Sequence, residues 1–134
     1  MDKPKILVVD DEPDLLSTLE YRLQQEGYEV DTADNGLTAL ERAQADRHDL
    51  IILDVMLPGE NGYRVAQTLR EGEVRAGRSR TPILLLTARD LSSDPEREKM
   101  FMDFSRADFM MYKPFDMGEL LETIQSLLAG PADA

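Results

Sequence analysis

Two short apolar runs, each ending in aspartate, constrain this sequence most. Ile6–Val9 leads directly into Asp10 and Asp11, and Leu50–Leu53 leads directly into Asp54. Continuous apolar runs rich in β-branched residues are typical of strands buried on both faces of a parallel sheet. Neighbouring parallel strands end at the same edge of the sheet, where open α/β sheets bind their ligands. We therefore expect the three carboxylates to share one site.

Three carboxylates in one site repel one another unless a cation lies between them. Mg²⁺ is a hard cation that takes oxygen ligands, usually one or two carboxylates together with water and phosphate oxygens. The pattern predicts a Mg²⁺ site with an aspartate within reach of the metal.

Strands and helices are expected to alternate from one end of the chain to the other. Apolar strands are predicted at 5–9, 50–53, 82–87 and 109–111, with an edge strand of alternating polarity at 28–32. A helix with an apolar stripe follows each strand, and the last is expected to begin at Asp116 with a capping box that includes Glu119. This alternation predicts an α/β domain in which a parallel sheet lies between helices.

Composition narrows the function classes. The 134 residues are enough for one domain, and the formal net charge of −12 argues against direct nucleic-acid binding. The sequence contains no cysteine and shows no apolar stretch of membrane-spanning length, so we expect a cytoplasmic protein without an anchor. The domain is expected to span residues 1–129, with residues 130–134 as a tail or the start of a linker.

Four motifs follow in order at the ends of successive predicted strands. They are VVDDE with Asp10 and Asp11, LDVMLPGENG around Asp54, LLLTA with Thr87, and YKPF with Lys113. Each is weak alone, but together they are specific. The sequence resembles the receiver domain of bacterial two-component response regulators over nearly its whole length. This resemblance implies a flavodoxin-like (βα)5 fold, a doubly wound three-layer sandwich with strand order 2-1-3-4-5.

The resemblance also implies roles for the acidic residues. Asp54 would be the phosphoacceptor, receiving a phosphoryl group from a histidine kinase or a phosphotransfer protein as an acyl phosphate. Asp11 would bind Mg²⁺ directly and Asp10 largely through water. Asp54 and the backbone carbonyl of Met56 would complete the metal ligands. The domain would catalyse only its own phosphorylation and dephosphorylation, and would not be an enzyme in the usual sense.

Three further groups would contact the phosphoryl group. Lys113 would supply a positive charge, the Thr87 hydroxyl a hydrogen-bond donor, and the Ala88 backbone amide another donor. Catalysis would consist of positioning and charge neutralisation, because the transition state of phosphoryl transfer spreads charge over three oxygens. The family also implies a cis peptide bond before Pro114, which a proline makes accessible.

The predicted switch residues, Thr87 and position 110, depart from the family pattern. Met110 stands where the family usually carries Tyr or Phe, and Arg106 stands where it often carries glycine. The segments around 71–80 and 90–94 are also longer than usual. We therefore expect phosphorylation to act mainly through the loop after Thr87 and the fourth helix, with weaker coupling to the fifth strand.

An output partner is expected on the face of the fourth helix, fifth strand and fifth helix, in the region 100–109. The protein would be a monomer or a phosphorylation-dependent homodimer. The Met and Phe residues between positions 100 and 111 are expected to serve core and interface packing. His48 is expected to be exposed in a turn, with no phosphohistidine role.

Two alternatives remain open. The first is a pseudo-receiver, a scaffold that binds its partner without phosphorylation. Met110 and Arg106 keep this alternative open, whereas the complete set of Asp11, Asp54, Thr87 and Lys113 argues against it. The second is a phosphohydrolase of the haloacid-dehalogenase type, which also uses an aspartate nucleophile and Mg²⁺. Such enzymes carry a second aspartate two residues after the nucleophile. Met56 stands at that position and has no acidic proton to give, so sustained turnover is not expected.

Overall fold

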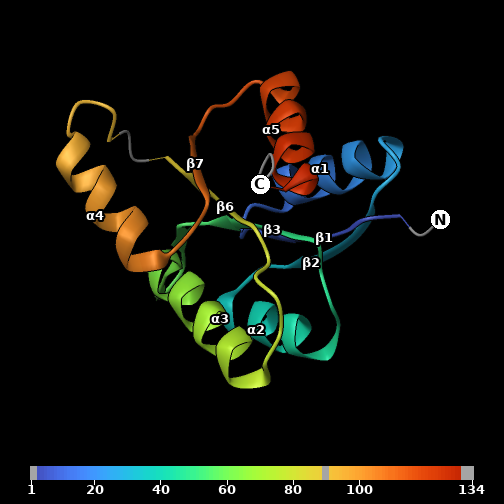
Figure 1. Cartoon of the computed structure of the whole chain (residues 1–134). Helices are drawn as coiled ribbons and strands as arrows, with labels where there is room; N and C mark the ends of the chain where they lie inside the picture. The colour runs from blue at the N-terminus through green and yellow to red at the C-terminus, as the bar shows by residue number, and fades with distance from the viewer. Residues whose placement is uncertain (1–2, 89–90, 131–134) are drawn as a thin grey trace.

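A parallel five-stranded sheet with helices on both faces forms the molecule (Figure 1). The computed structural model describes residues 3–88 and 91–130. The strand order is β2-β1-β3-β6-β7, which confirms the predicted order because β6 and β7 are the fourth and fifth strands of this sheet. The strands are β1 (Lys5–Val9), β2 (Glu29–Ala33), β3 (Leu50–Asp54), β6 (Ile83–Thr87) and β7 (Phe109–Tyr112).

Five helices make up the outer layers. They are α1 (Pro13–Gln25), α2 (Gly36–Ala45), α3 (Gly62–Ala76), α4 (Pro95–Ser105) and α5 (Met117–Ala129). Helices α1 and α5 cover one face of the sheet, α2 and α3 cover the other, and α4 lies beside α3 near β7 (Figure 1). No helix within the described ranges is both long and apolar enough to cross a membrane.

The central strands are buried on both faces, as their continuous apolar runs predicted. Successive side chains of a strand point to opposite faces, so each strand contributes to two cores. The core under α1 and α5 contains Ile6, Val8, Leu50, Ile52, Leu84 and Leu86. The core under α2 and α3 contains Leu7, Val9, Ile51, Leu53, Ile83 and Leu85.

Most helices begin at a side-chain cap. Asn35, Asn61, Asp94 and Asp116 each accept a hydrogen bond from a backbone N–H in the first turn of α2, α3, α4 and α5. Such a cap satisfies one of the donors that a helix start leaves without an intrahelical partner. The predicted start of the last helix at Asp116 is therefore confirmed.

Three local features were not predicted correctly from the sequence. In the longer segment around 71–80, residues 71–76 continue α3, which is capped by Gly77 in the left-handed conformation (φ 66°). A two-stranded antiparallel sheet, β4 (Met56–Leu57) with β5 (Glu60–Asn61), follows β3. The prediction for His48 was wrong, because this side chain is buried against β2 with Nε2 2.8 Å from Asp31 Oδ2.

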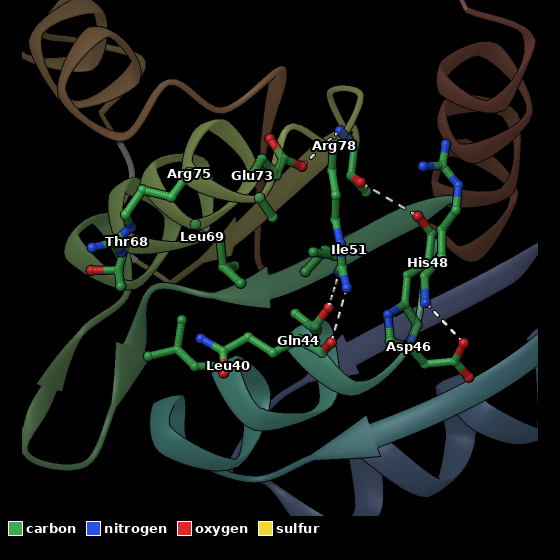
Figure 2. Close-up of a pocket in the computed structure, with 15 residues that line it drawn as sticks. Leu40, Gln44, Asp46, His48, Ile51, Thr68, Leu69, Glu73, Arg75 and Arg78 are labelled. Carbon is green, nitrogen blue, oxygen red and sulfur yellow. Dashed lines mark hydrogen bonds between the residues drawn. The ribbon is translucent and has the colours of Figure 1, made fainter.

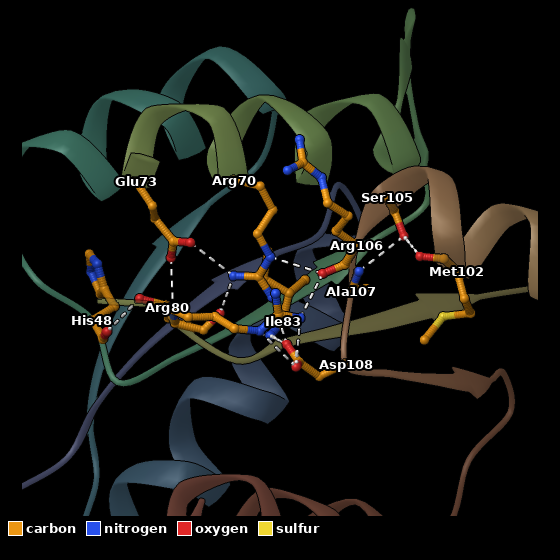
Figure 3. Close-up of polar contacts among 11 residues, drawn as sticks. His48, Arg70, Glu73, Arg80, Ile83, Met102, Ser105, Arg106, Ala107 and Asp108 are labelled. Atoms are coloured by element: carbon orange, nitrogen blue, oxygen red, sulfur yellow. Dashed lines mark hydrogen bonds and ion pairs between the residues drawn. The ribbon is translucent and has the colours of Figure 1, made fainter. Parts of the chain in front are cut away.

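A buried arginine, Arg70, holds the junction between α4 and β7. The junction begins at Arg106, which follows the last residue of α4 and has φ 57°, a conformation that favours glycine and is unfavourable for arginine. Its carbonyl accepts hydrogen bonds from Arg70 Nε (2.9 Å) and Arg80 Nη2 (3.0 Å), as Figure 3 shows. Arg70 is 3% exposed and also binds Asp108 at 2.7 Å. These contacts hold the turn in the conformation that a glycine would otherwise supply.

Candidate functional site

The carboxyl edge of the sheet brings the predicted acidic residues together. Strands β1 and β3 are neighbours with Val9 opposite Leu53, so Asp10 and Asp54 leave the sheet side by side. Both side chains are almost completely buried, at 0% and 2% exposure. Carboxylate oxygens of Asp10, Glu12 and Asp54 lie within 4.8 Å of one another.

Lys113 completes this cluster from the far end of β7. Its Nζ lies 3.0 Å from Asp10 Oδ2, 3.0 Å from Glu12 Oε1 and 3.4 Å from Asp54 Oδ2. Its backbone N–H donates to the Thr87 carbonyl, which links the β7 end to the β6 end. The peptide bond between Lys113 and Pro114 is cis, as the family pattern implied. One ammonium group therefore faces three carboxylates.

The pKa values of Asp54 and Lys113 are both raised, which disfavours the charged form of Asp54 and favours that of Lys113. Burial, assisted by the charge of Asp10, raises the pKa of Asp54, and the hydrogen bond from the Met56 N–H (3.0 Å) opposes this. Burial alone would lower the pKa of Lys113. The hydrogen bonds to Glu12 and Asp10 and the charge of Asp54 outweigh it and raise that pKa above its ordinary value. Lys113 is consequently positively charged at every physiological pH.

The third member of the cluster is not the residue that the sequence pattern singled out. Asp11, the expected direct metal ligand, is partly exposed and does not belong to the group of three carboxylates. Glu12 belongs to it and donates its backbone N–H to Asp10 Oδ1 (2.9 Å). The VVDDE run contained this residue, but the sequence-based prediction gave it no role in the site.

The other predicted site residues lie around Asp54. Thr87 ends β6 and is fully buried, one position beyond Leu86, which pairs with Asp54. Ala88 follows it and is exposed. Met56 donates its N–H to Asp54 Oδ1 while its side chain is 55% exposed. The contacts predicted for the Met56 carbonyl and the Ala88 amide stay predictions.

Gly62 holds the loop after Asp54 close to the sheet. Its N–H donates to the Val55 carbonyl at 2.9 Å, and a Cβ at this position would lie 2.5 Å from Val55 Cα. Only glycine permits this approach. The loop borders a cavity of about 490 Å³ that Thr87 also lines, together with Tyr63 and Phe101. These two rings stack with centroids 4.3 Å apart.

The face of α4, β7 and α5 combines buried and exposed apolar groups. Met110 is partly buried and packs against the core under α3, whereas Met111 packs against the core under α5. Met100, Phe104 and Phe109 are 55%, 40% and 44% exposed. The expected core role of the 100–111 cluster is therefore confirmed for some of its members, and an interface role for the exposed ones stays a prediction.

The oxygen donors fit a Mg²⁺ ion. Ligands on opposite sides of Mg²⁺ are about 4 Å apart, because each Mg–O bond is about 2.1 Å long. The spacing of the three carboxylates is compatible with that value. Asp10 is fully buried beside Asp54 with a single ammonium group between them, which leaves negative charge for a cation to neutralise.

The fold and this site belong to a family of signalling domains. The sequence profile of the response regulator receiver domain matches residues 6–125, so the chain belongs to this family. The matching domains are receiver domains of response regulators, which are not a classical enzyme family. The flavodoxin-like fold predicted from the sequence is confirmed with them.

Curated relatives are longer than this chain. It is 37% identical to the response regulator ArlR of Staphylococcus saprophyticus and 40% identical to the alkaline phosphatase synthesis transcriptional regulatory protein PhoP of Bacillus subtilis. Each match covers 92% of this chain but only 52% and 48% of the relative. The chain therefore spans about half the length of these relatives.

Solved structures of similar size match along nearly their whole length. A chemotaxis response regulator of Vibrio cholerae is 34% identical with a TM-score of 0.81, and the match covers 94% of this chain and 99% of that one. The response regulator TrrA of Thermotoga maritima, solved in complex with Mg²⁺ and BeF, is 40% identical with a TM-score of 0.73. That match covers 92% and 98% of the two chains.

Proposed function

We propose that this protein accepts a phosphoryl group on Asp54 from a histidine kinase or a phosphotransfer protein, in a Mg²⁺-dependent reaction that switches partner binding. The observation that carries this proposal is the buried Asp54 carboxylate, held beside Asp10 and within 3.4 Å of Lys113 at the ligand-binding edge of the sheet. The family membership and the Mg²⁺–BeF complex of a relative support it.

The residues present suit the chemistry. A carboxylate oxygen of Asp54 attacks phosphorus as the bond to the donor nitrogen breaks, which produces an acyl phosphate. Lys113 carries a fixed positive charge that offsets the oxyanions, and the Thr87 hydroxyl offers a hydrogen bond to one of them. The Met56 N–H orients the Asp54 carboxylate before the reaction. Bound Mg²⁺ would neutralise the carboxylates and the phosphoryl oxygens.

The metal ligands form part of the same proposal. Asp10, Asp11 and Asp54, with the Met56 carbonyl, are the proposed set, as the family pattern implies. Glu12 competes with Asp11 for the third carboxylate position because it lies with Asp10 and Asp54 in the cluster. Substitution of each residue by alanine in a Mg²⁺ titration would separate them, since loss of a direct ligand weakens binding more than loss of a residue that acts through water.

The decisive experiment is phosphorylation of matched variants. Incubation with Mg²⁺ and acetyl phosphate, or with a purified kinase, should add one acid-labile, hydroxylamine-sensitive phosphoryl group. Asp54→Asn and a metal chelator should each abolish it. Asp103→Asn is the control, because the Asp103 side chain is exposed on α4 and pairs with Lys99 of the same helix. Labelling that survives Asp54→Asn unchanged would contradict the proposal.

A phosphorylation-independent scaffold is the competing function. Met110 favours it, because a methionine at this position lacks the ring that the family uses to relay phosphorylation to the surface. A protein that takes no label, and that binds its partner equally well with Asp54→Asn, would establish the scaffold instead.

The remaining assignments extend the main proposal. We assign residues 1–129 to the receiver unit and residues 130–134 to a tail or linker, and place the protein in the cytoplasm with its kinase. The output partner would contact α4, β7 and α5, where Met100, Phe104 and Phe109 are exposed. A homodimer would form on the same face after phosphorylation.

A further inference from the structure

A groove lies between α2 and α3 at the amino edge of the sheet, opposite the phosphoacceptor site (Figure 2). Its volume is about 640 Å³, within the range of small-molecule sites. The apolar part of its lining consists of Leu40, Ala43, Ile51, Leu69 and Ala76. A ligand here would thus contact apolar carbon on the sheet side and polar groups at the rim.

The rim carries arginine charge that no carboxylate neutralises. Arg47, Arg75 and Arg78 all line the groove. Figure 2 shows Arg78 reaching from the end of α3 to α2, where it donates to the carbonyls of Ala43 (2.8 Å) and Gln44 (3.0 Å). Those acceptors are uncharged. Among the described residues, the side chains of Arg47 and Arg75 make no hydrogen bond or ion pair.

The two acidic residues of the lining are already engaged elsewhere. Asp46 binds the Lys5 ammonium group. Glu73 accepts from Arg70 Nη1 at 3.0 Å and from the Thr81 N–H at 2.8 Å, as Figure 3 shows. The groove is therefore a positively charged site in a chain whose formal net charge is −12.

A buried histidine adds a polar contact that is not yet satisfied. His48 is among the residues that line the groove, and its side chain is 1% exposed, with Nε2 bound to Asp31. Its Nδ1 is buried and has no hydrogen-bond partner in the part of the chain that the structure describes. Buried polar atoms without partners are uncommon and call for an explanation. A ligand with a hydrogen-bonding ring edge would supply the missing partner.

A helical glycine, Gly72, forms part of the groove lining. Gly72 lies inside α3, where glycine is less favourable than alanine. An added Cβ here would meet no atom within 4 Å, so no packing contact requires the glycine. The position instead leaves open space in the lining of the groove.

We propose that this groove binds a small organic phosphate with a flat, hydrogen-bonding ring, of the nucleotide class. The phosphate would lie among Arg47, Arg75 and Arg78, since the guanidinium fork matches phosphate oxygens. The ring would lie on the apolar floor with an edge toward His48. An inorganic phosphate ion would fill little of the volume and leave both the floor and the histidine without contacts.

The test uses the full chain and its only histidine as an NMR probe. Adenosine monophosphate should shift the His48 ring signals and the Gly72 amide in a saturable way. Adenosine and inorganic phosphate are the two partial probes, and each should bind at least about tenfold more weakly. Equal binding of inorganic phosphate would overturn the role of the ring. The absence of any saturable shift with millimolar adenosine monophosphate would overturn the proposal.

Two matched pairs of variants locate the binding. Gly72→Phe should abolish it by filling the groove, whereas Gly72→Ala should retain it. Arg75→Gln should weaken it about three- to tenfold, whereas Arg64→Gln, an equal charge change on the same helix outside the groove, should not. If Gly72→Phe does not fold, the comparison of Arg75→Gln with Arg64→Gln tests the proposal by itself. Equal affinities of these two variants for adenosine monophosphate would overturn it. Asp54→Asn should leave binding unchanged, which separates this result from the phosphorylation proposal.

Discussion

Replacing Asp54 by asparagine is expected to stabilise the metal-free protein at neutral pH. The exchange removes a negative charge that is 2% exposed, and it keeps an oxygen that can accept the hydrogen bond from the Met56 N–H. Burial and the neighbouring Asp10 already raise the pKa of Asp54, which means that the fold disfavours its ionised form. Asparagine avoids that penalty while filling the same volume.

The distances set the size of the effect. At an effective dielectric constant of about 20, the Asp10–Asp54 repulsion, at a separation of no more than 4.8 Å, is at least about 3.5 kcal/mol, and the Lys113–Asp54 attraction at 3.4 Å is about 5 kcal/mol. Glu12 adds a repulsion that solvent weakens, because its side chain is 61% exposed. The attraction by Lys113 and the repulsion by the neighbouring carboxylates nearly cancel. The burial of the Asp54 carboxylate therefore decides whether Asp54→Asn raises or lowers the stability. We expect a gain of about 1 kcal/mol, or about 4 °C in Tm.

The pH dependence follows from the direction of the pKa shift. Because the pKa of Asp54 is raised in the fold, the unfolded chain releases its proton first as pH increases. The wild type therefore loses stability as pH rises from the ordinary carboxyl pKa to the raised pKa of Asp54. Above the raised pKa, the destabilisation caused by ionised Asp54 stays constant. The Asp54→Asn variant should lack this contribution, so its advantage should disappear in acid.

Denaturation in the presence of a chelator measures the stability of the metal-free proteins and so tests this prediction. The wild type, Asp54→Asn and the surface control Asp103→Asn are compared at neutral and acid pH, and the control should change stability by less than about 0.5 kcal/mol. Mg²⁺ at a hundred times its Kd should then stabilise the wild type by about 2.7 kcal/mol and the Asp54→Asn variant by less. A metal-free Asp54→Asn protein that is less stable than wild type would refute the reasoning.

Three further perturbations test other parts of the structure. Arg70→Met should lower the free energy of urea unfolding by about 3 kcal/mol, because it leaves Asp108 without its buried partner. Arg80→Gln is the control, because its side chain is 55% exposed, and it should lower the free energy by less than about 1 kcal/mol. Equal losses would contradict the greater importance of the buried Arg70–Asp108 pair. Gly62→Ala should slow phosphorylation and lower Tm, since its Cβ would overlap Val55, and an unchanged labelling rate would show that the loop tolerates the displacement. With Mg²⁺ and beryllofluoride, amide NMR shifts should concentrate near Asp54 and along α4, and equally large shifts at Met110 and α5 would show that the coupling survives without an aromatic ring.

The arrangement of the sheet and the position of the site were predictable because they depend on local patterns. Apolar runs of strand length determine which segments are buried on both faces, and parallel neighbours necessarily end at one edge. Asp10, Asp54 and Lys113 therefore lie together, each at the end of its strand or directly after it. The capping of α5 by Asp116 was predictable for the same reason, since it involves residues three positions apart.

Other features depend on contacts between segments far apart in the sequence. His48 is buried with Nε2 against Asp31, which lies 17 positions earlier on β2, and nothing near His48 in the sequence indicates this contact. Arg70 is buried because Asp108, 38 positions later, neutralises it. Neither side chain could be placed without knowing which strands and helices are neighbours.

The sequence by itself thus determined that Asp10, Asp54 and Lys113 would converge at the carboxyl edge of the sheet. Only the tertiary structure decided that Glu12, and not Asp11, joins Asp10 and Asp54 within 4.8 Å. The physical reason is that strand periodicity specifies the direction of side chains only up to the last residue of β1. Beyond that residue, the path of the turn into α1 and the attraction of the Lys113 ammonium group determine which carboxylate faces the site.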